Sequence, residues 1–171
     1  TFTRADGLLA DRGYALAVDG GGRLWVSHTE GLSWFDGRRF HGVAGDAGLP
    51  AHTVRALGVA RDGALLAGGY GHVSRRNGTG DPPRFRTWGS EAGLGDVLVL
   101  TVAEVEAGHL LLGTNRGVLL FDPVADAGRG AILRRFDRDN GAIATEVSHS
   151  GACARDRSGR SWFGFKGGVT G

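Results

Sequence analysis

Four glycines, each followed by a short apolar run, recur along this chain with spacings of 41, 45 and 51 residues, at Gly22, Gly63, Gly108 and Gly159. A second glycine follows each of them eight or nine residues later, at Gly31, Gly71, Gly117 and Gly168. Units of roughly 40–50 residues with such internal offsets are typical of repeat proteins. The spacing therefore predicts four similar structural units.

The second unit shows how one repeat divides into strands. Segments 52–60, 64–69, 72–77 and 84–89 are short and extended in character, and Asp62-Gly63 is a hairpin signal between the first two. No segment of ten or more residues has helical periodicity. Four-stranded units of this length pack radially. We predict an all-β fold, a β-propeller of about four blades with four antiparallel strands each; a β-sandwich built from hairpins is the alternative.

The chain from residue 1 to 171 is interpreted as one propeller segment. Its first seven residues are expected to form a strand like the outer strand of a unit, and the fourth unit has no outer strand of its own. Either the first strand closes the last blade into a four-bladed ring, or the chain is part of a larger array. The repeats are expected at residues 8–46, 49–91, 94–140 and 142–171.

Charge and cysteine content narrow the function. Twenty Lys and Arg stand against 18 Asp and Glu, and the two signs are interleaved, so a nucleic-acid partner is not expected. A single cysteine, Cys153, excludes an internal disulfide. No run approaches about 18 apolar residues, so no membrane contact is expected within this segment. The sequence contains no methionine, which favours a processed protein or a piece of a longer one.

Two stretches resemble the two-component regulator propeller repeat: AGLPAHTVRALGVARDGALLAGG at residues 47–69 and GACARDRSGRSWFGFKGGVT at residues 151–170. The first contains the Gly-Leu-Pro opening of that repeat, and the second has its central pattern around Asp156 and Trp162. The chain departs from the pattern at Leu66, where the repeat usually has tryptophan.

This resemblance implies the periplasmic, or extracytoplasmic, sensor part of a bacterial inner-membrane receptor. Such propellers are linked to a histidine kinase, a diguanylate cyclase or a DNA-binding output, and glycans are frequent ligands in the family. Arrays in the family usually have more than four blades, which favours a segment of a larger propeller array. The expected partners are the remaining receptor domains or neighbouring blades, and two copies pairing as a homodimer is a further alternative.

One face of the propeller is the expected ligand side. Loops that lead into the first strand of each unit open there, together with loops that join the second and third strands. Polar and aromatic side chains around a concavity suit a sugar or another polar metabolite. The candidate ligand-binding residues are Arg12, His28, Glu30, His52, Tyr70, His72, Asp96, Asn115, Arg116, Glu146 and Lys166.

The histidines do not predict a metal site, because the six of them are widely spaced and form no H-x-H or HExxH motif. The sequence also contains no catalytic grouping and no cofactor motif. Trp25 and Trp162 occupy equivalent positions and are expected in the core between blades.

Three functions remain open from the sequence. The first is a ligand-sensing segment of a signalling receptor, which binds a glycan or another polar small molecule. The second is a propeller lyase or hydrolase that acts on polysaccharide, and the third is a protein-interaction or dimerisation scaffold.

Overall fold

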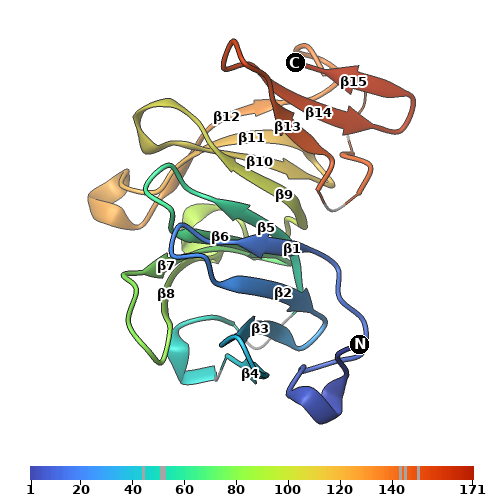
Figure 1. Ribbon diagram of the computed structural model, residues 1–171. Helices are drawn as coiled ribbons and strands as arrows, with labels where there is room; N and C mark the ends of the chain where they lie inside the picture. The colour runs from blue at the N-terminus through green and yellow to red at the C-terminus, as the bar shows by residue number, and fades with distance from the viewer. Residues whose placement is uncertain (44, 51–52, 143, 145, 150) are drawn as a thin grey trace.

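A computed structural model describes residues 1–171 except 44, 51–52, 143, 145 and 150. The described residues form four antiparallel sheets that lie side by side, from the blue end of Figure 1 to the red end. The first sheet, blade 1, consists of β1 (Leu16–Val18), β2 (Leu24–His28), β3 (Gly31–Phe35) and β4 (Phe40–Gly42). Blade 2 consists of β5 (Val54–Val59), β6 (Leu65–Gly69), β7 (His72–Asn77) and β8 (Arg84–Trp88).

The other two sheets continue the same order. Blade 3 consists of β9 (Val99–Glu104), β10 (Leu110–Thr114), β11 (Gly117–Asp122) and β12 (Ala131–Phe136). Blade 4 consists of the three described strands β13 (Cys153–Arg155), β14 (Ser161–Phe165) and β15 (Gly168–Thr170). Short 3-10 helices precede or connect the strands, at η1 (Arg4–Asp6), η2 (Gly45–Ala47), η3 (Ser90–Ala92), η4 (Glu106–Gly108) and η5 (Asp126–Gly128).

This architecture confirms the predicted all-β propeller blades. Every sheet lies within one of the four expected repeat ranges, and β7 has the bounds expected for the third strand of the second unit. The Asp62-Gly63 turn joins β5 to β6, with Gly63 in the left-handed region at φ 85°. Among the described residues, no helix has the length and apolar character needed to cross a bilayer.

The hydrophobic core lies between successive blades. The strands β1, β5, β9 and β13 contact one another from blade to blade, which makes them the inner strands. Between blades 1 and 2, Trp25 packs with Leu65 and Phe85, and the ring centroids of Trp25 and Phe85 are 6.0 Å apart. A second apolar cluster joins blades 2 and 3, and a third, around Phe163, joins blades 3 and 4.

The strand expected at residues 1–7 is wrong. The segment forms η1, in which Thr3 and Asp6 make a reciprocal capping box and Gly7 ends the turn at φ 96°. Phe2 packs edge-on against Phe35 and Phe40 of blade 1. The segment therefore corresponds to the turn that follows an outer strand, as η3 follows β8, and not to the strand itself.

Candidate functional site

A cavity of about 490 Å³, here called the central cavity, lies where the four inner strands or the segments leading into them converge. All four blades contribute to its lining. Leu98 and Leu100 of blade 3 form its apolar wall. The polar side chains that line it are Arg12, Tyr14, Arg55, Glu146, Ser148 and His149.

Two of the lining residues lie at β-bulges. Pairing between β5 and β6 shifts between Val54 and Ala56, so Arg55 is the extra residue of the ladder in blade 2. Pairing between β9 and β10 passes over Leu100 in the same way. A bulge takes its extra residue out of the regular alternation of a strand and re-aims the side chain. The bulges explain why Arg55 and Leu100 both line the central cavity.

Blades 1 and 4 place a residue at the same point without a complete inner strand there. Ser27 is the fourth residue of β2. Its carbonyl oxygen accepts a hydrogen bond from the backbone N–H of Tyr14 (2.9 Å), and its own N–H donates to the carbonyl oxygen of the residue after Tyr14. Gly164, the fourth residue of β14, accepts one from Ser148 (2.9 Å) and donates one to Ala152 (2.9 Å). Tyr14 and Ser148 thus correspond to the two bulge residues, and each blade lines the cavity with its residue at this position.

Glycine in the second strand brings the inner strands together around the cavity. A Cβ atom on Gly68 of β6 would lie 2.5 Å from a methyl carbon of Val99 in blade 3. A Cβ atom on Gly113 of β10 would lie 3.1 Å from a methyl carbon of Val147, on the segment leading into blade 4. A larger residue at Gly68 would overlap with the inner strand of the next blade, so glycine allows these blades to pack closely.

Positive charge gathers on one side of the central cavity. The guanidinium carbon of Arg12 lies 5.2 Å from the centroid of the Tyr14 ring, and that of Arg55 lies 4.4 Å from it. Both distances are within the range of a cation–π contact. The tyrosine ring therefore holds two arginine side chains of different blades at the same part of the wall.

Arg12 and Glu146 are the two predicted site residues that line the central cavity. Tyr14, Arg55 and His149 also line it but were missed. Arg55 was interpreted as an ordinary strand residue, and no pattern in the sequence marks the bulge that re-aims its side chain.

His28 and His72 are buried, with 1% and 2% of their surfaces exposed. Because a carbonyl oxygen can only accept, Nδ1 of His28 donates to the carbonyl oxygen of Arg12 at 3.1 Å. Nδ1 of His72 donates to the carbonyl oxygen of Tyr70 at 3.2 Å. Neither imidazole lines the central cavity, and both stabilise the backbone of loops.

The predicted site residues of blade 3 lie in two loops. Asp96 is in the loop before β9, and Asn115 and Arg116 are in the loop between β10 and β11. Oδ1 of Asn115 accepts a hydrogen bond from the backbone of Leu98 at 2.8 Å, which fixes the loop leading into β9. Nη1 of Arg116 pairs with Oδ2 of Asp96 at 2.7 Å, and both side chains are exposed. Asn115 therefore supports the cavity wall through Leu98, whereas the ion pair lies outside the lining.

The other predicted residues are not brought into the central cavity. Glu30, Tyr70 and Lys166 are exposed, and the hydrogen bond from Thr29 lowers the pKa of Glu30. His52 lies outside the described residues. Ligand binding by any residue of the predicted set stays a prediction.

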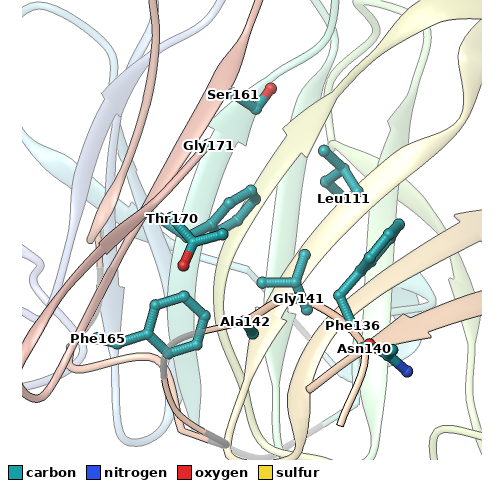
Figure 2. Close-up of a pocket in the computed structure, with 11 residues that line it drawn as sticks. Leu111, Phe136, Asn140, Gly141, Ala142, Ser161, Phe165, Thr170 and Gly171 are labelled. Carbon is teal, nitrogen blue, oxygen red and sulfur yellow. The ribbon is translucent and has the colours of Figure 1, made fainter. Parts of the chain in front are cut away.

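A second cavity of about 230 Å³ lies between blades 3 and 4. Figure 2 shows Leu111 and Phe136 of blade 3 on one side of it and Phe165 and Thr170 of blade 4 on the other. No charged side chain occurs among its described lining residues. It is a gap in the apolar core between two blades, and the central cavity is the better candidate for a polar ligand.

Nothing in the described parts of the chain indicates a metal site. No three His, Cys, Asp or Glu side chains come together there in a group that could hold a metal ion. Burial raises the pKa of the Cys153 thiol, which keeps it protonated near neutral pH.

Comparisons with known proteins give structural matches only. No family model and no curated protein matches the chain. The extracellular domain of a putative hybrid two-component system from B. thetaiotaomicron matches with a TM-score of 0.71 and 21% identity, over 96% of this chain and 21% of that chain. The extracellular domain of a second B. thetaiotaomicron protein, described as a putative one-component system, matches with a TM-score of 0.73 and 17% identity, over 99% of this chain and 22% of that chain.

A further structure of the second domain, described as part of a putative hybrid two-component system, gives a TM-score of 0.73 at 18% identity. At these identities the matches confirm the propeller fold. This chain spans about a fifth of the length of the chains that it matches.

Proposed function

We propose that this chain is an extracytoplasmic ligand-sensing segment of a bacterial signal-transduction receptor, and that its central cavity binds a glycan or another polar small molecule. One observation carries the proposal: each of the four blades places a side chain from the same structural position on the wall of one cavity. Its volume of about 490 Å³ lies within the range of small-molecule sites, roughly 300–1,000 Å³.

The comparisons support the signalling context of this proposal. The matched structures are described as extracellular domains of two-component or one-component systems, and the repeats of the sequence resemble those of the same class. Binding without turnover is the behaviour that we expect. Glu146, Ser148 and His149 are the lining residues that acid–base or nucleophilic chemistry would need, so the test includes product analysis. Fold alone does not decide function, so the site has to be tested directly.

The test is calorimetric titration of the protein with neutral and acidic mono- to trisaccharides, with product analysis after long incubation. We expect saturable binding with the saccharide recovered intact. Release of shorter or unsaturated sugars would contradict the sensing role and favour a lyase or hydrolase.

A blocking variant links binding to the central cavity. Ser148→Phe places a ring in the cavity wall and should abolish binding, whereas Thr79→Phe adds the same ring to an exposed loop and should leave binding unchanged. Equal binding by both variants, with melting curves like that of the unmodified protein, would exclude the central cavity as the ligand site.

A further inference from the structure

Two arginines of the central cavity have no acidic partner. Among the described residues, no carboxylate oxygen lies within 4.0 Å of the guanidinium nitrogens of Arg12 or Arg55. Both guanidinium groups lie over the ring of Tyr14. A ring face attracts a cation but does not neutralise it.

Six other arginines of the described chain have an acidic partner. Ion pairs with aspartate within 4.0 Å occur at Arg23, Arg75, Arg76, Arg84, Arg116 and Arg129. Most of these pairs lie on the outer parts of the blades or in exposed loops. Exposed arginines without a carboxylate partner, such as Arg38, also occur in the described chain. Arg12 and Arg55 differ from these because both lie on the wall of one cavity.

The position of Arg55 adds an independent observation. Arg55 is half-buried at the bulge of β5, between the buried residues Val54 and Ala56. Keeping an unneutralised cation in a partly desolvated wall opposes folding, and a bound anion would offset that cost. Bulges of this kind often re-aim a side chain beside a functional site.

The charges of the lining define what the cavity would bind. The lining contains two guanidinium groups and one carboxylate, that of Glu146, together with the imidazole of His149. Guanidinium groups bind carboxylate and sulfate oxygens through paired N–H donors.

We propose that the ligand of the central cavity is an acidic saccharide, whose carboxylate or sulfate group is bound by Arg12 and Arg55. This inference rests on the proposed function, because it names the ligand class of the same cavity. The hydroxyl groups of such a ligand have acceptors and donors available at Glu146 and Ser148.

Matched pairs of sugars test the charge. Galacturonate and galactose 6-sulfate, with digalacturonate as a longer probe, are compared with galactose and galactobiose by calorimetry. We expect the acidic members to bind and the neutral members to bind at least about tenfold more weakly. The preferred acidic group, carboxylate or sulfate, follows from the same series.

Variants then assign the charge to named residues. Arg12→Gln and Arg55→Gln should each weaken binding of the acidic sugar by about tenfold or more, because each removes a charge-assisted hydrogen bond. Glu146→Gln removes the one negative charge of the lining and should tighten binding. Arg38→Gln removes an exposed arginine of blade 1 and is the matched control, with unchanged affinity.

A salt titration needs no variant. Raising the ionic strength from about 20 mM to about 500 mM should weaken binding of the acidic sugar and leave that of a neutral sugar unchanged. Equal affinity for neutral and acidic sugars, insensitive to Arg12→Gln and Arg55→Gln, would overturn this inference and leave the proposed function standing. If no neutral or acidic saccharide in the series binds, this inference is contradicted, and so is the glycan form of the proposed function.

Discussion

Trp25 in blade 1 and Trp162 in blade 4 occupy the same place in two copies of one local structure. Trp25 pairs with Ala17 across the ladder, and Trp162 pairs with Ala154 in the same register. Yet Trp25 is fully buried and 36% of Trp162 is exposed. The two sites separate what a blade determines by itself from what its neighbour adds.

The turn before each tryptophan is built around an aspartate. Oδ1 of Asp19 accepts hydrogen bonds from the backbone of the turn, and Oδ2 accepts one from Nε1 of Trp25 at 2.9 Å. Asp156 does the same for its own turn, and its Oδ2 accepts from Nε1 of Trp162 at 2.9 Å. This arrangement depends on local sequence alone, so it forms in both blades.

The difference comes from the next blade. Arg76 of β7 in blade 2 donates through Nη1 to Oδ2 of Asp19 at 2.9 Å and lies over the Trp25 ring, 5.3 Å from its centroid. Burial acts to raise the pKa of Asp19, but hydrogen bonds and the charge of Arg76 hold it below its usual range. In the described structure, no further blade packs on the corresponding side of Trp162. Its ring is covered there by Arg160, which belongs to the turn just before β14.

Trp25→Ala should have the largest effect. The substitution leaves a cavity between blades 1 and 2 and removes the donor to Asp19, so we expect the free energy of unfolding to fall by about 3–5 kcal/mol. Urea denaturation followed by far-UV circular dichroism measures the change. A loss below about 1 kcal/mol would mean that blades 1 and 2 do not depend on this core.

Arg76→Met should come next, at about 3 kcal/mol, because the carboxylate of Asp19 stays buried after its cation is removed. The double variant Arg76→Met with Asp19→Asn should recover part of the loss, since it removes the uncompensated charge. The same denaturation experiment applies, and a double variant less stable than the sum of the two single ones would contradict the explanation.

Trp162→Ala should cost about 1 kcal/mol, because the ring is already partly in solvent and loses less apolar burial. Intrinsic fluorescence and urea denaturation follow this variant beside Trp25→Ala. If the two substitutions cost the same, the neighbouring blade does not account for the difference between the sites.

The smallest effect should be one that changes with pH. Hydrogen bonds from Ser158, then from Trp162 and Arg160, lower the pKa of Asp156 to about 2. A carboxylate with a lowered folded-state pKa contributes stability above its unfolded value, about 3.9, and loses it as the pH falls toward the folded one. Asp156→Asn should therefore be less stable than the unmodified protein near neutral pH, and the difference should disappear as the pH falls through about 2.

Asp139→Asn is the control for that experiment, because Asp139 is an exposed carboxylate in the turn before blade 4. Its denaturation midpoint should follow the unmodified protein across the same pH range. A gap between Asp156→Asn and the unmodified protein that stays constant down to the lowest pH would contradict the assigned role of Asp156.

Glycine spacing and hairpin turns were enough to predict the blades. They depend on contacts within about 45 residues, and the bounds of β7 and the burial of Trp25 followed from them. The burial of Trp162 was predicted wrongly, because it depends on a neighbour that the local pattern does not contain. The strand expected at residues 1–7 failed for a related reason: the similarity lay in the glycine turn, and the described residues give the segment no strand to pair with.

The central cavity could be predicted only in outline. Loop position identified Arg12 and Glu146 as candidates, because both lie in segments that lead into inner strands. Arg55 escaped because its neighbours Val54 and Ala56 follow a regular strand alternation, and the register shift between them arises from pairing with β6. A register shift depends on how two strands pair, so the sequence of one strand does not reveal it.

The bulges also separate the residues that would recognise a ligand from the residues that hold each sheet together. At two of the four blades the side chain that reaches the central cavity belongs to a residue the ladder passes over, so exchanging it disturbs no cross-strand pair. Blade packing and cavity chemistry can then vary independently of each other. A propeller built in this way can acquire a new specificity by point substitutions, one blade at a time, while its scaffold stays the same.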